Sequence, residues 1–284
     1  MFLFKKVNDF KDFVRRKRLE NPDCTFGFVP TMGALHQGHI SLIKRSVAEN
    51  NFTVCSIFVN PTQFNEKTDL DNYPRTIEND MALLEKAGNS ILLWPSATEV
   101  YPPKLKTKLS ISFDGLENVM EGYFRPGHFD GMAQVVKRLL DIVESDRLYM
   151  GQKDFQQVAI VRNMIEQLSI PVELVMCPII REKDGLAMSS RNVRLPKRHR
   201  KEVPIIHKTL KSIARKIEKQ PITKLKEWAI EQLSLSDLKP EYFEIVDGRT
   251  LQAVTNVNET DYVVACVAVW VGEVRLIDNM ILKE

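Results

Sequence analysis

The stretch PTMGALHQGH, residues 30–39, decides how this chain folds. The apolar run FGFV at 26–29 leads into it, and apolar residues recur at helical spacing over 40–48. We therefore expect a strand, then a turn over Thr31 to His39, then a helix. A helix N-terminus presents unpaired backbone N–H groups and the positive end of the helix dipole, so this turn suits an anion such as a phosphate.

Two glycines and two histidines give the turn its chemistry. Gly33 and Gly38 lack the Cβ atoms that would keep a phosphate away from the backbone. His36 and His39 add two imidazoles at its mouth. The helical zinc signature needs histidines four residues apart with a glutamate beside the first, whereas here Gln37 follows the first and the spacing is shorter. We interpret the turn as a phosphate site rather than a metal site; the remaining alternative is a purely structural role for the histidines.

Composition limits the function classes. A chain of 284 residues predicts roughly two domains, and 44% hydrophobic with 27% charged residues is ordinary for a globular protein. The net charge of +3 offers no large basic footprint for nucleic acid. No apolar stretch is long enough for a signal peptide or a membrane span, so we expect a cytoplasmic protein. The four cysteines are far apart, form no Cys-x-x-Cys and lie in or beside apolar runs, which predicts buried free thiols rather than disulfides or a zinc site.

The order of the elements predicts the fold class. Over residues 1–178, short apolar runs alternate with helical patterns, which is typical of an α/β fold with a Rossmann-like, doubly wound parallel sheet. The expected later strands are 54–59, 91–94, 148–150 and 172–176, and the expected helices are 73–87, 132–143 and 155–168. Over residues 179–284 we expect a smaller α+β domain that acts as a lid. Its expected helices are 197–218 and 223–233, and its expected strands are 242–246, 262–271 and 274–277.

Polar motifs follow several of these strands, where ligands bind in such sheets. In the segment 58–64, Asn60 and Gln63 can fix hydroxyl or carboxylate groups without charge. In the segment 151–157, Lys153 suits a phosphate, and Asp154 either accepts from ribose hydroxyls or caps the following helix.

Two further segments have interpretations that the residues leave open. Residues 188–192, MSSRN, form either a flexible clamp for a polyphosphate or a polar linker. Residues 197–201, KRHRK, are either a nucleic-acid patch or, as we favour, the solvated start of a helix after Pro196. The chain carries neither a P-loop nor a Gly-x-Gly-x-x-Gly motif, which argues against a P-loop enzyme and a dinucleotide oxidoreductase.

Six motifs, in this order, resemble those of the pantothenate synthetase (pantoate–β-alanine ligase) family within the nucleotidyl-transferase superfamily. They are PTMGALHxGH (30–39), FVNPxQF (58–64), YPRT (73–76), RPGHFDG (125–131), GQKDxQQ (151–157) and DGLAMSSRN (184–192). The resemblance runs from about residue 26 to the C-terminus. It implies that ATP activates pantoate as an enzyme-bound pantoyl adenylate, which β-alanine then converts to pantothenate, releasing AMP and pyrophosphate. It also implies Mg²⁺ with the ATP and a homodimer, with no nucleic-acid or membrane partner.

The same resemblance implies the site residues. The implied ATP-binding residues are Met32, Gly33, Ala34, Leu35, His36, Gln37, Gly38, His39, Gly151, Gln152, Lys153, Asp154, Ile180, Met188, Ser189, Ser190 and Arg191. The implied catalytic residues among them are His36, His39 and Lys153, with His39 as the proton donor. The implied residues for pantoate and β-alanine are Asn60, Gln63 and Gln157. No protein ligand for a metal is implied.

The chain departs from the expected pattern at two places. The second signature of the superfamily commonly contains lysines, whereas this chain has MSSR at 188–191, and Lys153 would provide the missing cation. Met132 stands where we expect a valine, which alters packing rather than chemistry. The alternative function is another nucleotidyl-transferase that leaves the nucleotide on its product, and a non-enzymatic alternative is an RNA-binding module using residues 197–201.

Overall fold

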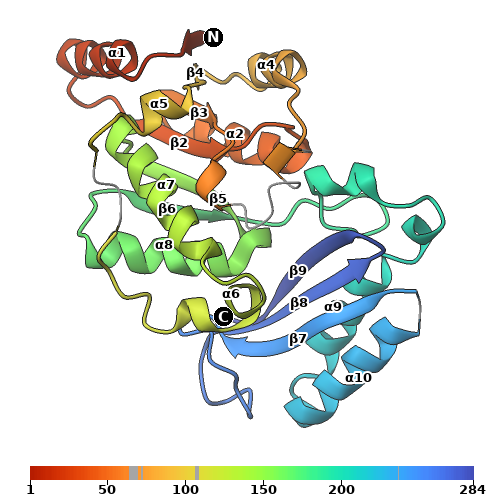
Figure 1. The fold of residues 1–284 in the computed structure, drawn as a ribbon. Helices are drawn as coiled ribbons and strands as arrows, with labels where there is room; N and C mark the ends of the chain where they lie inside the picture. The colour runs from red at the N-terminus through yellow and green to blue at the C-terminus, as the bar shows by residue number, and fades with distance from the viewer. Residues whose placement is uncertain (64–69, 72, 106–108, 236) are drawn as a thin grey trace. The chain divides into compact units, whose positions relative to one another are not determined.

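A computed structural model describes residues 1–63, 70–71, 73–105, 109–235 and 237–284. It divides into two compact units, which are drawn in Figure 1. The first unit comprises Met1–Glu117, Arg125–Gly151 and Ile160–Cys177, and the second comprises Asn118–Phe124, Gln152–Ala159 and Pro178–Glu284. Two short segments that precede residue 160 therefore belong to the same unit as the C-terminal part.

The first unit is built on a six-stranded parallel sheet, as the alternating pattern predicts. Its strands are β1 (Phe2–Phe4), β2 (Phe26–Thr31), β3 (Phe52–Ile57), β4 (Ile91–Leu93), β5 (Arg147–Gly151) and β6 (Glu173–Cys177). The order across the sheet is β1-β4-β3-β2-β5-β6. The chain leaves β2 toward β3 on one side and later returns to β5 on the other. The C-terminal end of β2 is therefore a topological switch point, where open α/β sheets bind ligands.

Helices cover both faces of this sheet (Figure 1). The helices that contribute to the first unit are α1 (Val7–Glu20), α2 (Gln37–Glu49), α4 (Ile77–Lys86), α5 (Ala97–Val100), α7 (His128–Val143) and most of α8 (Phe155–Gln167). On one face Val29 packs with Ile43 of α2 and Leu84 of α4. Side chains alternate between the two faces along a strand, so Phe26 lies on the opposite face, where Arg18 of α1 stacks over its ring at 5.1 Å.

Several element boundaries differ from those that the sequence predicts. Helix α4 begins at Ile77 rather than residue 73, because Pro74 disfavours helical geometry in the residue before it. Helix α7 begins four residues earlier than expected, at His128. In α2 the expected apolar Ala48 is exposed, and Ser46 is buried instead, with its hydroxyl 2.8 Å from Thr53 Oγ1.

The N-terminal pair of elements, β1 and α1, was not predicted from the sequence. Strand β1 has only three residues, and it forms the edge of the sheet beside β4. Helix α1 buries one narrow apolar stripe, which charged residues dilute. Short or dilute patterns of this kind give weak periodic signals.

The second unit contains a three-stranded antiparallel meander covered by helices, which agrees with the expected α+β class. Its elements are α6 (Met120–Phe124), α9 (Ile205–Lys216), α10 (Ile222–Ser234), β7 (Lys239–Asp247), β8 (Val263–Val271) and β9 (Val274–Lys283). Ile213 of α9 and Leu225 of α10 pack with Phe243 of β7 and Val267 of β8 in one core cluster. Helix α9 is shorter than expected, because a 3-10 turn over His199–Lys201 precedes it.

Strand β8 is buried on both faces, which is unusual in an antiparallel sheet. The core cluster covers one face of the meander. Residues from earlier in the chain lie against other parts of it, since Phe124 stacks on Tyr242 and Phe155 meets Tyr262 edge-on. This explains why segments 118–124 and 152–159 belong to the second unit.

Candidate functional site

The signature turn follows β2 at the switch point of the sheet. Strand β2 includes Thr31, and α2 begins at Gln37, so the turn is shorter than expected and His39 lies in the first turn of the helix. Gly33 has φ +83° and Ala34 has φ +49°. A positive φ is uncommon for alanine and costs about 1–3 kcal/mol, so the surrounding structure must hold this conformation.

Asp80 of α4 provides that restraint. Its side chain is 1% exposed and accepts hydrogen bonds from Ala34 N (2.9 Å) and Leu35 N (2.8 Å). The Thr76 hydroxyl also donates to it, at 3.2 Å. A Cβ atom added to Gly33 would lie only 3.1 Å from the same carboxylate. Asp80 was not predicted as a site residue, although a signal was present: an aspartate interrupts the apolar stripe of this helix.

The two histidines cap helix α2. His36 is the N-cap residue, and its Nδ1 accepts a hydrogen bond from Gly38 N at 3.1 Å. His39 Nδ1 accepts from His36 N at 3.3 Å, and the two ring centroids are 4.0 Å apart. A nitrogen that accepts a backbone hydrogen bond carries no proton, so each neutral imidazole has its N–H at Nε2. The capping role and a role toward an anion are therefore compatible, because they use opposite nitrogens.

The amides that follow β3 lie next to this turn. Gln63 Nε2 is 3.0 Å from Met32 Sδ, which brings the second motif to the first. Asn60 is 1% exposed, and the protein itself uses its polar atoms: Nδ2 donates to Gly131 O (3.2 Å), and Oδ1 accepts from Tyr101 OH (3.1 Å). Phe64, at the end of this motif, lies outside the described residues.

Segment 125–132, which carries the motif RPGHFDG, packs against the backbone around Gln63. His128 Nδ1 lies 3.0 Å from Gln63 O. A Cβ atom at Gly131 would be 2.3 Å from Thr62 O, so only glycine permits this approach. Met132, the departure from the expected valine, is 2% exposed and packs in the interior. The segment therefore fixes the backbone that carries Gln63.

The remaining expected nucleotide residues, apart from Gly151, belong to the second unit. Residues Gln152–Asp154 form a 3-10 turn, in which Lys153 Nζ lies 3.5 Å from Asp154 Oδ1. Gln157 is half-buried at the start of α8. Its neighbour Gln156 is buried and binds segment 118–124, since it donates to Val119 O and accepts from the N–H of Glu121.

The structure pairs the two residues expected to meet adenine. Met188 N donates to Ile180 O at 2.9 Å, so the two backbones lie side by side. Residues Ser190–Arg194 form a short 3-10 helix, which Ser189 caps by accepting from Arg191 N at 3.2 Å. Residues 188–192, expected to form either a phosphate clamp or a polar linker, are half-buried, and both interpretations remain open.

An ion-pair network lies between segment 118–124 and the meander. Arg275 donates to Glu121 Oε2 at 2.7 Å and to Glu241 Oε2 at 2.8 Å. Burial opposes the charge of Arg275, but its two carboxylate partners hold its pKa above the ordinary value. Tyr242 OH donates to Glu121 at 2.8 Å, and burial raises the pKa of this tyrosine well above its ordinary value.

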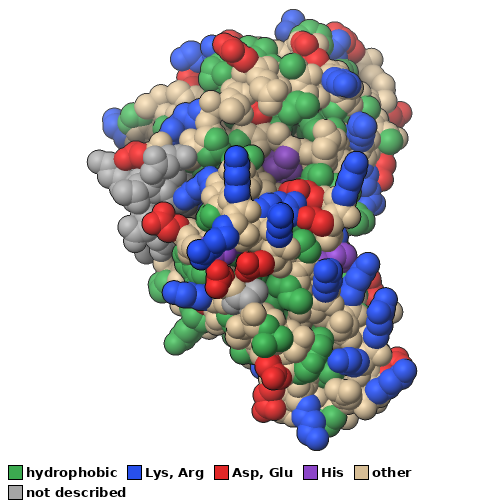
Figure 2. Space-filling model, turned by 90° about the vertical axis from the view of Figure 1, so that its right-hand side faces the viewer, with side chains coloured by type: hydrophobic (Ala, Val, Ile, Leu, Met, Phe, Trp, Pro, Cys, Tyr) green, Lys and Arg blue, Asp and Glu red, His purple; other side chains and the backbone are tan. Residues whose placement is uncertain are grey.

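The basic run at 197–201 does not form a uniform basic patch. Arg198 pairs with Asp237 at 3.0 Å, and Arg200 pairs with Glu182 at 2.6 Å. On the face drawn in Figure 2, acidic side chains interrupt the basic ones. The run contributes His199 to the group of potential metal ligands found among the described residues, together with Glu202 and Asp237. None of these three residues is an expected site residue.

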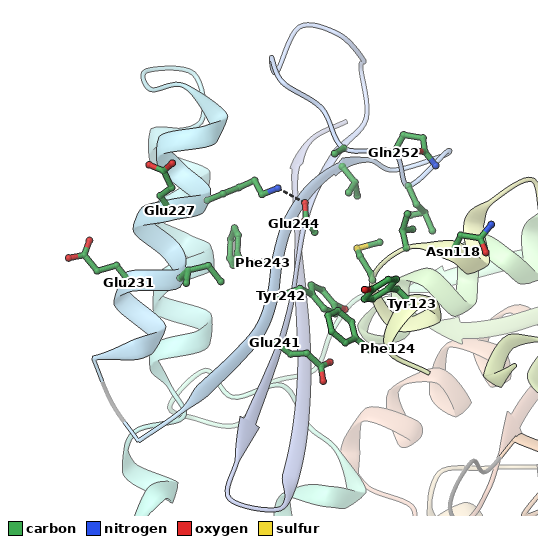
Figure 3. Close-up of a pocket in the computed structure, with 17 residues that line it drawn as sticks. Asn118, Tyr123, Phe124, Glu227, Glu231, Glu241, Tyr242, Phe243, Glu244 and Gln252 are labelled. Carbon is green, nitrogen blue, oxygen red and sulfur yellow. Dashed lines mark hydrogen bonds and ion pairs between the residues drawn. The ribbon is translucent and has the colours of Figure 1, made fainter. Parts of the chain in front are cut away.

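A cavity of about 920 Å³ opens in the second unit, and none of its lining residues is an expected site residue. Figure 3 shows it around the edge of β7, with α10 on one side and the aromatic residues of segment 118–124 on the other. Phe124 stacks on Tyr242 there, with ring centroids 5.8 Å apart. In the wall of the cavity, Lys226 of α10 forms an ion pair with Glu244 of β7.

All four cysteines are free and buried, as the sequence predicts. Among the helices that the structure describes, none has both the length and the apolar character needed to cross a membrane.

Known proteins resemble this chain along its whole length. The model of the family described as Pantoate-beta-alanine ligase matches residues 2–281. Pantothenate synthetase of Porphyromonas gingivalis is 50% identical over 284 residues, 99% of each chain. The Bacteroides thetaiotaomicron protein of the same name is 52% identical over 262 residues, 91% of each chain.

Solved structures of proteins with these names are also similar to this chain. Pantothenate synthetase from Thermus thermophilus has a TM-score of 0.91 at 37% identity and covers 100% of both chains. The pantoate-beta-alanine ligase from Francisella tularensis, described as complexed with beta-gamma ATP and beta-alanine, has a TM-score of 0.80 at 33% identity and covers 99% of this chain and 98% of its own.

Proposed function

The chain belongs to the pantoate–β-alanine ligase family, and from this premise we propose how its residues join pantoate to β-alanine. The reaction consumes ATP and forms pantothenate, AMP and pyrophosphate, a step of coenzyme A biosynthesis. It passes through pantoyl adenylate. A carboxylate does not react with an amine directly, because oxide is a very poor leaving group, and adenylation replaces it with AMP.

In the first step the pantoate carboxylate attacks the α-phosphorus of ATP in line, and pyrophosphate leaves. The protein must position the two reactants and neutralise the charge that grows on pyrophosphate. In the second step the neutral amine of β-alanine attacks the acyl carbon and expels AMP. Neither step requires a nucleophilic side chain, in keeping with buried cysteines.

The observation that carries the assignment is the pair of capping histidines at the switch point. Because backbone N–H groups occupy Nδ1 of His36 and His39, both rings are donors at Nε2. We assign these donors, with the N-terminus of α2 and the turn from residue 32 to 39, to the ATP phosphates. His39 is assigned as the proton donor, in line with the family resemblance.

The rest of the ATP site is assigned to Gly151 and to residues of the second unit. Lys153 would neutralise phosphate charge, and Asp154 would accept from ribose hydroxyls. The remaining proposed contacts are Gly151 and Gln152 with the nucleotide, Ile180 and Met188 with adenine, and Ser189, Ser190 and Arg191 with the β- and γ-phosphates.

Pantoate is assigned to Gln63 and Gln157, and Gln63 is also assigned to β-alanine. Asn60 was expected to orient substrate. Since its polar atoms bind Gly131 and Tyr101, we assign it the narrower task of holding the backbone around Gln63.

We further propose a homodimeric, cytoplasmic enzyme whose domains span residues 1–178 and 179–284, the second acting as a lid. Mg²⁺ would arrive on the ATP phosphates. Among the described residues the potential ligand group includes His199, whereas Mg²⁺ prefers oxygen ligands, so no protein ligand is assigned and no step depends on the ion.

Product analysis tests the function. The purified protein with ATP, pantoate and β-alanine should yield pantothenate, AMP and pyrophosphate in equal amounts, and omission of any one component should abolish pantothenate. Mass spectrometry decides against the alternative, because a nucleotidyl-transferase would leave a nucleotidylated product instead.

The RNA-binding alternative predicts affinity that falls steeply as salt rises. Acidic partners offset the charges of Arg198 and Arg200 in this run, so we expect no binding in a salt titration with single-stranded RNA. Tight binding at low salt that vanishes at high salt would favour the alternative.

Truncation of His39 tests its role. His39→Ala removes one Nε2 donor, so pantoate-dependent ATP–pyrophosphate exchange should fall by about 10²–10³. The lost capping bond should cost only about 1 kcal/mol of unfolding free energy. Near-normal exchange would remove His39 from the mechanism.

A further inference from the structure

Asn279 of β9 is bound to one turn by every polar atom of its side chain. It is 2% exposed. Its Nδ2 donates to Gln152 O and to Lys153 O, both at 2.9 Å, and its Oδ1 accepts from Gln152 Nε2 at 3.1 Å. All of these residues belong to the second unit.

Two donors on two consecutive carbonyls restrain the backbone between them. The orientations of Gln152 O and Lys153 O define the peptide plane on each side of the Lys153 Cα atom. Asn279 therefore fixes the direction in which the Lys153 side chain leaves the turn. A lysine is flexible and its charge lies at the end of a long stem, so the anchoring of its Cα decides which volume the ammonium can reach.

The preceding residue of β9 holds a second segment. Asp278 is 4% exposed, and its two oxygens accept from Arg181 at 2.6 and 2.9 Å. Arg181 in turn donates to Gly185 O at 3.0 Å and forms an antiparallel bridge with Ala187. Asp278 Oδ1 also accepts from Asn279 N at 2.8 Å, so the two anchors are joined.

One dipeptide thus fastens two segments of the second unit: the turn at 152–154, which carries Lys153, and the hairpin at 181–187, which leads into residues 189–191. Our proposed function assigns Lys153 and residues 189–191 to the ATP phosphates, in addition to the signature turn. A buried ion pair is weak evidence for stability, since desolvation offsets much of its attraction. A role in fixing geometry accounts better for so many polar groups at one place.

We propose that Asn279 is a positioning residue for adenylation, acting through Lys153, and that Asp278 with Arg181 extends the same anchor to the hairpin before residues 188–191. This inference rests on the proposed function. It places a positioning residue for the phosphates on β9, which carries none of the six sequence motifs.

Two substitutions and a control test it. Asn279→Asp keeps the size of the side chain and the acceptor for Gln152 but removes both donors. Asn279→Ala removes all three bonds. Ile213→Val, in the core of the same unit and 0% exposed, is a control for a modest loss of stability.

Pantoate-dependent ATP–pyrophosphate exchange is the readout. Both Asn279 variants should lower kcat/KM for ATP by about 10²-fold, because a displacement of about 1 Å has an effect of that size. KM for pantoate should stay within about twofold, and Ile213→Val should exchange at the wild-type rate. Thermal unfolding should show all three variants folded at the assay temperature.

A double-mutant cycle separates positioning from general damage. If Asn279 acts through Lys153, the variant Asn279→Asp/Lys153→Ala should be no slower than Lys153→Ala alone. Effects that multiply would overturn the proposal, and so would a loss in Asn279→Asp no larger than that in Ile213→Val.

The remaining outcomes are also distinguishable. If Lys153→Ala exchanges pyrophosphate at the wild-type rate, this inference and the role of Lys153 are both wrong. Pantothenate formation by the wild-type protein would still support the proposed function in that case. A wild-type protein that makes no pantothenate would instead refute the proposed function itself.

Discussion

Asp80→Asn should weaken both the stability and the activity of this enzyme. The substitution keeps the side-chain volume but turns one acceptor oxygen into an NH₂ group, which faces a backbone N–H of the signature turn. The native carboxylate accepts from Ala34 N and Leu35 N in a site where Asp80 is 1% exposed. Loss of one charge-assisted hydrogen bond and an unsatisfied buried N–H should together cost about 3 kcal/mol.

The effect on activity follows from the strained backbone. Ala34 has φ +49°, and Asp80 is the side chain that holds it there. If the turn relaxes, the donors of His36 and His39 move away from the phosphates, and exchange should fall by about 10²-fold.

Urea denaturation and pantoate-dependent ATP–pyrophosphate exchange measure the two effects. Asp12→Asn is the matched control, because its partner Arg15 is 3.3 Å away on an exposed surface and such pairs contribute little. If Asp80→Asn matches Asp12→Asn in both assays, the reasoning about the turn is wrong.

Two further predictions concern the second unit and the thiols. Arg275→Leu removes the guanidinium that pairs with buried Glu121 and half-buried Glu241, so the free energy of unfolding should fall by about 3–5 kcal/mol. A urea midpoint equal to that of the wild type would contradict this. Burial raises the pKa of Cys55 to about 12, so iodoacetamide at about pH 8 should not alkylate this residue in the folded protein. In denaturant all four cysteines should be alkylated. Mass spectrometry measures the labelling, and alkylation of Cys55 in the folded protein would contradict the prediction.

The class of the sheet and the signature turn could be predicted from the sequence, because residues close together in the chain determine both. Apolar runs mark the buried parallel strands, and a glycine turn before a helical stripe marks the switch-point loop. The boundaries were less accurate where a proline interrupted the helical pattern, as at Pro74 before α4.

Features that depend on distant partners could not be predicted from the sequence. Asp80 binds a turn 45 residues away, and Asn279 binds Lys153 across 126 residues of chain. Asn60 carries an amide that suits a substrate, yet its tertiary neighbours use its polar atoms. Periodicity shows which face of an element is buried, but it does not show which polar group lies opposite, so such contacts require the folded structure.

The fate of one oxygen atom tests the central claim, that ATP activates the acid as an adenylate. In the adenylate a carboxylate oxygen of pantoate bridges carbon and the α-phosphorus, and it leaves with AMP when the amine attacks the acyl carbon. With pantoate labelled by ¹⁸O in its carboxylate, mass spectrometry should find one labelled oxygen in each AMP and one in the amide of pantothenate. Unlabelled AMP, or label in inorganic phosphate alongside ADP, would contradict the account.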